Sequence, residues 1–149
     1  MFTKILIPTD GSKTAVKAVE AGVELATRLG ASVVALGVAD TRLHISQTLP
    51  ASAAAGRVKE PIEDYLNEAA EACVDEVRKE CEKASVKVKT VVAKGHPVKE
   101  IMKEARRSKA DLIVIGSHGR SALAATVLGS VTYGVINGDT KVPVLVIRK

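Results

Sequence analysis

The stretch Asp111-Leu112-Ile113-Val114-Ile115-Gly116-Ser117-His118-Gly119 places an apolar run directly before two glycines. Nine residues, 120–128, separate Gly119 from Gly129 and Ser130, which complete the pattern G-x2-G-x9-G-S. An apolar run without alternation is typical of a parallel strand covered on both faces. Glycines after such a strand let backbone N–H groups approach an anion, and a helix that starts at the serine adds unpaired N–H donors. The stretch therefore predicts a buried strand, a phosphate-binding turn and the start of a helix.

The rest of the chain alternates between apolar runs and segments with helical periodicity. In addition to 111–115, strands are expected over 4–8, 32–39, 86–93 and 142–147. Apolar residues at three- and four-residue steps predict helices after Ser12, over 61–84, after Pro97 and over 130–136. Strands that alternate with helices in this way favour a doubly wound α/β fold, with one five-stranded parallel sheet and helices on both faces.

Two places depart from this regular pattern. Residues Asp40 to Glu60 are rich in small side chains and lack clean periodicity, so we expect a loop with a short helical piece near Pro50 to Ala55. The longest helix is then expected to start at Pro61, because proline is tolerated in a first turn. Gly134 lies inside the last expected helix, where glycine costs ~1 kcal/mol relative to alanine; close packing is one reason for a glycine there.

The composition favours one intracellular domain over residues 1–149. At 46 % hydrophobic and 2 % aromatic, the chain can form a core of Val, Ile, Leu and Ala, but it offers little for base stacking. Cys73 and Cys81 lie about 12 Å apart along one expected helix, too far for a disulfide. We expect reduced cysteines, a cytoplasmic protein and no membrane partner, since no segment approaches ~18 apolar residues.

The net charge of +5 is unevenly distributed. Residues 86–109 carry eight basic side chains against two acidic ones, and residues 61–84 carry eight acidic side chains against three basic ones. Solvated helix faces explain this distribution. Because no nucleic-acid recognition motif accompanies the basic segment, we expect no nucleic-acid partner.

The glycine pattern differs from two common phosphate-binding motifs. A P-loop needs G-x-x-x-x-G-K-[ST], and the dinucleotide fingerprint needs G-x-G-x-x-G after the first strand. That strand here ends in Pro8-Thr9-Asp10-Gly11-Ser12. Ligands of open parallel sheets bind at the carboxyl ends of the strands, which selects the loops over 8–11 and 116–119. No His, Cys, Asp or Glu cluster has the spacing of a protein-held zinc site.

The pattern from Gly116 to Ser130 resembles the ATP-binding motif of the universal stress protein family. The segments 5–12, 111–121 and 142–148 are also similar to that family, and the resemblance covers the whole chain. It implies a Rossmann-like sheet of the adenine nucleotide alpha hydrolase type, with strand order 3-2-1-4-5.

The resemblance also implies an ATP site with Mg or Mn, the metal being held mainly through the phosphates. The residues expected at the adenine are Pro8, Thr9, Asp10 and the backbone of Val38. The residues expected around the phosphates are Ile115, Gly116, Gly119, Arg120, Gly129, Ser130, Val131 and Thr132. Arg120 is the only cation expected near the phosphates, because Ala124 and Ala125 stand where family members often carry basic residues.

Several of these residues have alternative roles. Asp10 could be a turn residue that accepts local N–H bonds, although the resemblance favours ligand contact, and Ser12 is expected to be a helix cap. A general base must reach the attacking water and be held by a third group. The sequence offers neither for His118, which we expect to be exposed in its loop. His44 and His96 are also expected to face solvent.

By this resemblance the chain would be an ATP-binding regulatory protein of the stress response, with at most weak hydrolysis. The alternatives are a slow ATPase or phosphotransferase, for which Arg120 and His118 are the local candidates, and a nucleotide-free interaction protein. Family members commonly dimerise through the last strand, so a homodimer through Val142 to Ile147 is expected. An edge protected by Pro143 and Lys149 is the alternative.

Overall fold

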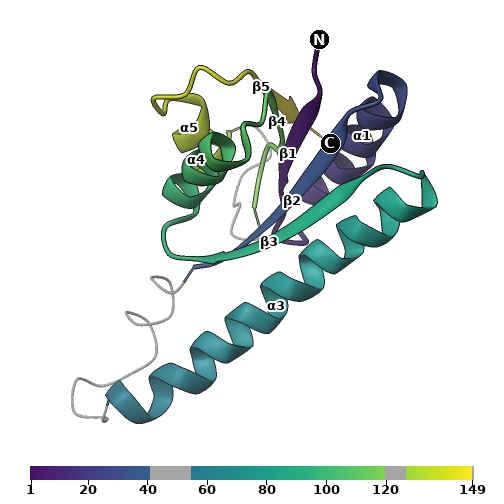
Figure 1. Ribbon diagram of the computed structural model, residues 1–149. Helices are drawn as coiled ribbons and strands as arrows, with labels where there is room; N and C mark the ends of the chain where they lie inside the picture. Colours follow the sequence, from purple (N-terminus) through teal and green to yellow (C-terminus); the bar gives the residue numbers. More distant parts are fainter. Residues whose placement is uncertain (41–54, 120–126, 149) are drawn as a thin grey trace.

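The computed structural model describes residues 1–40, 55–119 and 127–148 (Figure 1). Five parallel strands form one sheet in the order β3-β2-β1-β4-β5, as expected. The strands are β1 (Lys4–Pro8), β2 (Ser32–Ala39), β3 (Val88–Lys94), β4 (Leu112–Gly116) and β5 (Val144–Ile147). In the centre, Ile5 pairs with Val33 of β2 on one side and with Leu112 of β4 on the other. The doubly wound prediction is confirmed.

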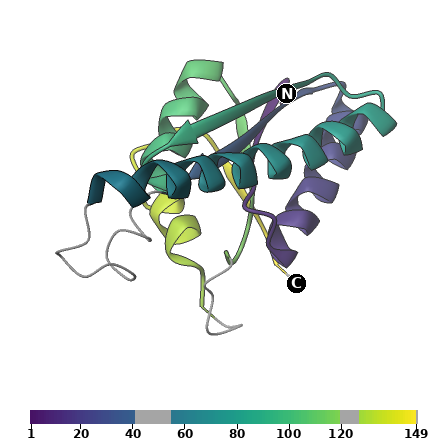
Figure 2. The same cartoon turned by 90° about the horizontal axis from the view of Figure 1, so that it is seen from below.

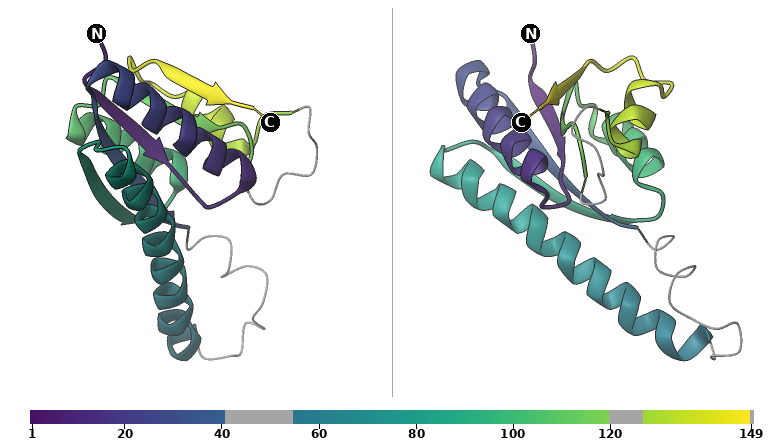
Figure 3. Two further views of the ribbon diagram at one scale, coloured as in Figure 1. Left: turned by 90° about the vertical axis from the view of Figure 1, so that its right-hand side faces the viewer. Right: turned by 180° about the vertical axis from the view of Figure 1, so that it is seen from behind.

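Helices cover both faces of the sheet. The helices are α1 (Lys13–Leu29), α3 (Ala55–Lys83), α4 (Pro97–Ser108) and α5 (Ser130–Ile136). Figure 1 and Figure 3 show α1 and α3 on one face and α4 and α5 on the other. Side chains of a strand alternate between faces, so Ile5 and Ile7 pack under α1 and α3 whereas Leu6 packs under α4. No helix among the described residues is long and apolar enough to cross a membrane.

The longest helix begins earlier than the sequence predicts. α3 starts at Ala55 rather than at Pro61, so residues 55–60 of the expected loop are helical. Proline lacks the N–H that would bond to the carbonyl of Arg57, and the helix continues through this missing bond. The rest of the expected loop, 41–54, lies outside the described residues. Figure 2 and Figure 3 show the beginning of α3 extending past the sheet. The helix buries its side chains against the sheet further along, for example at Val74, Val77 and Cys81.

Two strand boundaries also differ from the prediction. β5 starts at Val144 instead of Val142, because Pro143 has no N–H to donate to the ladder. Its carbonyl still accepts a bond of 2.9 Å from the Ile113 N–H. β3 spans Val88–Lys94 instead of 86–93, since Ser85 takes a left-handed conformation (φ 57°) and the chain turns there.

Candidate functional site

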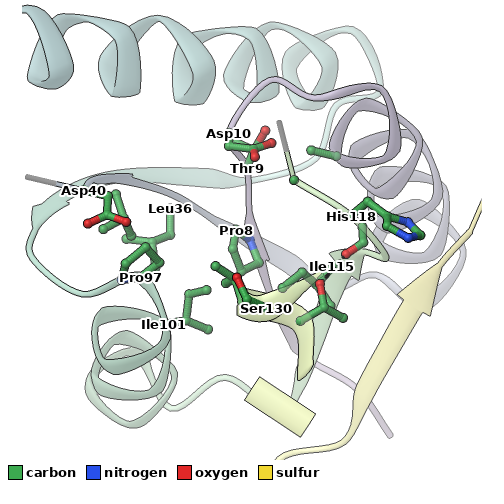
Figure 4. A pocket seen from close by; sticks show the side chains of 16 residues that line it. Pro8, Thr9, Asp10, Leu36, Asp40, Pro97, Ile101, Ile115, His118 and Ser130 are labelled. Atoms are coloured by element: carbon green, nitrogen blue, oxygen red, sulfur yellow. Dashed lines mark hydrogen bonds between the residues drawn. The ribbon is translucent and has the colours of Figure 1, made fainter. Parts of the chain in front are cut away.

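The carboxyl ends of β1, β2 and β4 surround a cavity of about 260 Å³ (Figure 4). Residues of these strand ends, of the loops that follow them and of the first turns of α4 and α5 line it. Of the residues expected at the ATP site that the structure describes, all except Gly129 line it. Those that line it are Pro8, Thr9, Asp10, Val38, Ile115, Gly116, Gly119, Ser130, Val131 and Thr132.

Gly129 packs against the glycine loop and does not line the cavity. Its N–H donates to the Ser117 carbonyl at 2.8 Å. A Cβ at this position would lie 3.2 Å from the His118 Cα, so glycine lets the start of α5 approach the loop. Arg120 lies outside the described residues.

The sequence prediction missed six residues of the lining. They are Ala15, Leu36, Asp40, Pro97, Ile101 and His118. Strand alternation could have found Leu36 and Asp40, because they lie two residues on either side of Val38 on the same face. Pro97 and Ile101 stand one turn apart on α4, and only the folded chain brings that turn beside β2.

The lining has an apolar end and a polar end. Figure 4 shows Leu36, Pro97 and Ile101 together at one end with Asp40 above them, whereas Ser130 lies toward the glycine loop. Pockets with this character bury the apolar body of a small ligand and hold it through a few polar groups. The shape suits a ligand that has a flat apolar part and a charged part.

Close backbone contacts fix the start of the glycine loop. A Cβ on Gly116 would lie 2.7 Å from the carbonyl carbon of Thr14, so no other residue fits there without moving α1. The Gly116 carbonyl accepts a bond of 2.7 Å from the Thr132 hydroxyl, and the Ser117 N–H donates to the Ile147 carbonyl at 2.8 Å. The loop is thus tied to α5 and to β5 before it reaches Gly119.

Asp10 and Ser12 form the turn between β1 and α1. The Ser12 N–H donates to the Asp10 carboxylate at 2.9 Å. The Ser12 hydroxyl caps α1 by accepting from the Ala15 N–H at 3.4 Å, which confirms the expected cap. Asp10 acts as a turn residue and also lines the cavity, and a Cβ on Gly119 would lie 3.0 Å from its carboxylate.

The histidine near the cavity does not direct its ring into it. The His118 Nδ1 lies 2.8 Å from the hydroxyl of the buried Ser117. In Figure 4 the imidazole points away from Pro8 and Ser130. The Nε2 atom is buried and has no hydrogen-bond partner within the described ranges. His118 is half-buried rather than exposed as expected, with its Nδ1 against Ser117 and its Nε2 out of reach of solvent.

His96 also differs from the expectation of a solvent-facing residue. It is the N-cap residue of α4 and is half-buried, and its backbone carbonyl accepts from the Glu100 N–H at 3.0 Å. Its Nδ1 is buried without a hydrogen-bond partner in the part of the chain that the structure describes. His44 lies outside the described residues.

The described lining carries negative and no positive side-chain charge. Asp10 and Asp40 contribute carboxylates, and no Lys or Arg is among the described residues that line the cavity. No group of three or more His, Cys, Asp or Glu side chains in 1–40, 55–119 and 127–148 could hold a metal ion. Among the described residues, the lining therefore offers no Lys or Arg side chain to an anionic ligand.

Comparison with known proteins relates the chain to one family along its whole length. The family model described as "Universal stress protein family" matches residues 1–148. Universal stress protein MJ0531 of Methanocaldococcus jannaschii is 36 % identical, over 100 % of this chain and 84 % of the relative. The solved structure of protein MJ0577 superposes with a TM-score of 0.85 at 34 % identity, over 100 % of this chain and 97 % of the other.

Two more distant structures share the fold and were solved with nucleotides. A universal stress protein in complex with cAMP has a TM-score of 0.69 at 22 % identity, with 99 % of this chain and 97 % of the other covered. The universal stress protein from Archaeoglobus fulgidus in complex with dAMP has a TM-score of 0.66 at 20 % identity, with coverage of 99 % and 98 %.

Proposed function

Since this chain belongs to the universal stress protein family, we propose that it binds ATP in the cavity at the carboxyl ends of β1, β2 and β4. In this proposal it is a nucleotide-dependent regulatory protein of the stress response. The observation that carries the proposal is a glycine loop packed directly on α1, at the polar end of a cavity whose other end is apolar. The cAMP and dAMP complexes of distant relatives show that this fold accommodates adenine nucleotides.

The adenine would occupy the apolar end. Pro8, Thr9, Asp10 and the backbone of Val38 contact the base in this proposal, and Leu36 and Ile101 add apolar walls. The described lining holds no aromatic side chain, so recognition of the base would depend on its polar edge. A carboxylate or a main-chain group is chemically suited to the adenine amino group.

The phosphates would lie along the glycine loop and the start of α5. Gly116 and Gly119 leave room for them, and the Ser130 hydroxyl lies beside the loop. The first N–H groups of a helix have no partner within it; here they belong to Ser130, Val131 and Thr132. The proposed phosphate end is completed by Ile115, Gly129 and Arg120. The assignment of Arg120 comes from the sequence alone.

A divalent cation would accompany the nucleotide. A bare triphosphate carries several negative charges, and the described lining includes no Lys or Arg side chain to offset them. Mg or Mn held through the phosphates supplies the missing positive charge, and no protein ligand is assigned to it. This chemistry fits a cavity whose described lining lacks Lys and Arg.

Regulation rather than catalysis is the activity that we assign. A hydrolase would need a group that orients water and one that stabilises the transferring phosphoryl charge. The imidazole of His118 points away from the cavity (Figure 4), which argues against it as that first group. The proposal includes at most weak hydrolysis and a homodimer through Val142 to Ile147, since β5 is the last strand of the sheet.

A direct experiment tests the proposal. The purified protein is extracted with acid and the released nucleotide is identified; ATP is then titrated with and without Mg, and ADP is followed over hours. Bound ATP with negligible turnover is the expected result. Sustained turnover would favour the slow ATPase instead. Absence of binding at millimolar ATP would overturn the site and leave the nucleotide-free interaction protein.

A further inference from the structure

One hydroxyl group joins α1 to the glycine loop. Thr14 is the second residue of α1 and is only 7 % exposed. Its hydroxyl donates to the backbone carbonyl of His118 and accepts from the backbone N–H of the same residue at 3.3 Å. A hydroxyl can do both, since it has one proton and two lone pairs. Both polar backbone groups of one loop residue are thus held by a single side chain.

The neighbouring cap residue strengthens this link. The Ser12 hydroxyl also donates to the His118 carbonyl, at 3.3 Å, and a carbonyl oxygen has two lone pairs to accept both bonds. Ser12 and Thr14 precede His118 by 106 and 104 residues. These long-range bonds therefore fix the position of the loop relative to the start of α1.

The backbone of Thr14 is also packed closely against the loop. The backbone of Thr14 lies so close to Gly116 that a Cβ there would be 2.7 Å from the Thr14 carbonyl carbon. The same residue therefore touches the loop at Gly116 through its backbone and at His118 through its side chain. Thr14 itself is not part of the cavity lining, whereas Gly116, His118 and Gly119 are.

We infer that Thr14 is a positioning residue for the phosphate end of the cavity. Its hydroxyl holds the His118 peptide so that the loop from Gly116 to Gly119 keeps the shape that receives phosphate oxygens. This inference rests on the proposed function. Since the Thr14 hydroxyl bonds to the loop and Thr14 does not line the described cavity, its effect should fall on ligands that carry phosphates and not on the nucleoside alone.

Substitution of Thr14 separates this role from a structural one. Thr14→Val keeps the side-chain shape and removes the hydroxyl, and Thr14→Ser keeps the hydroxyl and removes the methyl. We expect MgATP to bind to Thr14→Val about tenfold more weakly, which corresponds to the net loss of one or two hydrogen bonds. Adenosine should bind within about twofold of wild type, and Thr14→Ser should restore MgATP binding.

Thr27→Val is the matched control. Thr27 is also in α1, and its hydroxyl donates to the Val23 carbonyl at 2.8 Å, far from the loop. This variant loses a threonine hydroxyl bond of the same helix and should bind MgATP as wild type does. If Thr14→Val does not fold, Thr14→Ala removes the hydroxyl without placing a second methyl against the loop, and the same measurements apply.

The outcomes discriminate between the inference and the proposed function. If Thr14→Val binds MgATP with wild-type affinity, the inference is overturned but the proposed ATP site is not. Equal losses for MgATP and adenosine, with a lower Tm, also overturn it, because Thr14 would then be structural only. A wild-type protein that binds neither ligand overturns the proposed function and the inference together.

Discussion

Gly134 of α5 lies directly against Val98 of α4. A Cβ added to Gly134 would stand 2.7 Å from one Val98 methyl, 3.3 Å from the other and 3.5 Å from the Val98 Cβ. Val98 would have to shift or change its rotamer to admit a Cβ at this position. Close packing, the reason that the sequence offered for this glycine, is observed here, and it sets the separation of the two helices whose first turns line the cavity.

Replacing Gly134 by alanine should therefore destabilise the protein despite a better helix propensity. Alanine gains ~1 kcal/mol over glycine in a helix, and overpacking typically costs ~1–3 kcal/mol. We expect Gly134→Ala to lower the free energy of unfolding in urea by about 1 kcal/mol. In a Val98→Ala background the same change should be stabilising; stabilisation in both backgrounds would contradict the contact.

The two glycines of the loop should respond differently to alanine. A Cβ on Gly116 meets the backbone of Thr14 and Ala15 at 2.7 and 2.8 Å, whereas among the described residues a Cβ on Gly119 meets the Asp10 carboxylate at 3.0 Å and no backbone atom. Backbone gives way less readily than the end of a side chain. Gly116→Ala should lower Tm by several degrees, and Gly119→Ala should leave Tm close to wild type. Equal Tm values would refute this packing.

ATP binding should depend on a divalent cation. The described cavity lining includes no Lys or Arg, and Arg120 is the one cation that the sequence offers to the phosphates, so a metal ion would carry most of the compensation of the triphosphate charge. Calorimetric titration with ATP should show at least about tenfold weaker binding in EDTA than in Mg. Adenosine, which is uncharged, serves as the control and should bind with the same affinity in EDTA and in Mg. Equal ATP affinity in both buffers would point to compensation by protein cations.

The buried Cys81 thiol should make the protein less stable in alkaline solution. Burial, with Glu80 and Glu82 nearby, raises the pKa of this thiol from 9.0 to about 11. Between these values the unfolded chain loses the thiol proton while the folded protein keeps it, so stability is present below pH 9 and is lost as the pH rises. Each pH unit in this window costs at most ~1.4 kcal/mol.

Urea unfolding of wild type and Cys81→Ala between pH 9 and 11 isolates this effect. All other ionisable groups are the same in the two proteins, so the difference in slope belongs to Cys81. The variant is less stable at neutral pH, because it leaves a small cavity, but its stability should fall less steeply. Parallel slopes would rule out a buried protonated thiol.

The proposed homodimer can be tested at the last strand. Leu145 of β5 is 37 % exposed although it is a large apolar residue. A charge at this edge opposes pairing with a second copy, so Leu145→Glu should convert a dimer to a monomer in light scattering. Tyr133→Glu, on the exposed surface of α5, is the control. A wild-type protein that is monomeric at high concentration would remove the basis of this prediction.

The sequence predicted the sheet well because its signals are local. The apolar run at 111–115, the cap at Ser12 and the strand–helix alternation depend on neighbouring residues, and they led to the observed strand order through the family resemblance. The two loops over 8–11 and 116–119 meet at one cavity, as expected, because parallel strands present their carboxyl ends at one edge. The individual residues proposed for the ATP site came from the family resemblance.

The parts that the sequence did not predict depend on contacts between distant segments. Val98 and Gly134, or Thr14 and His118, meet only after folding, and no local pattern marks such a pair. The early start of α3 has a different cause, since here a local signal was present but misleading. Pro61 is a strong local signal for a helix start, yet a single missing N–H bond does not end a helix of this length.

The position of β1 in the middle of the sheet has a consequence for synthesis of the protein. β1 leaves the ribosome before the other four strands of its sheet, and its neighbour β4 comes 107 residues later, as the pairing of Ile5 with Leu112 shows. Ile5, Leu6 and Ile7 are fully buried in the finished protein but must remain uncovered on one side while most of the nascent chain is made. Such delayed pairing exposes an apolar strand to aggregation and makes it a natural binding segment for chaperones.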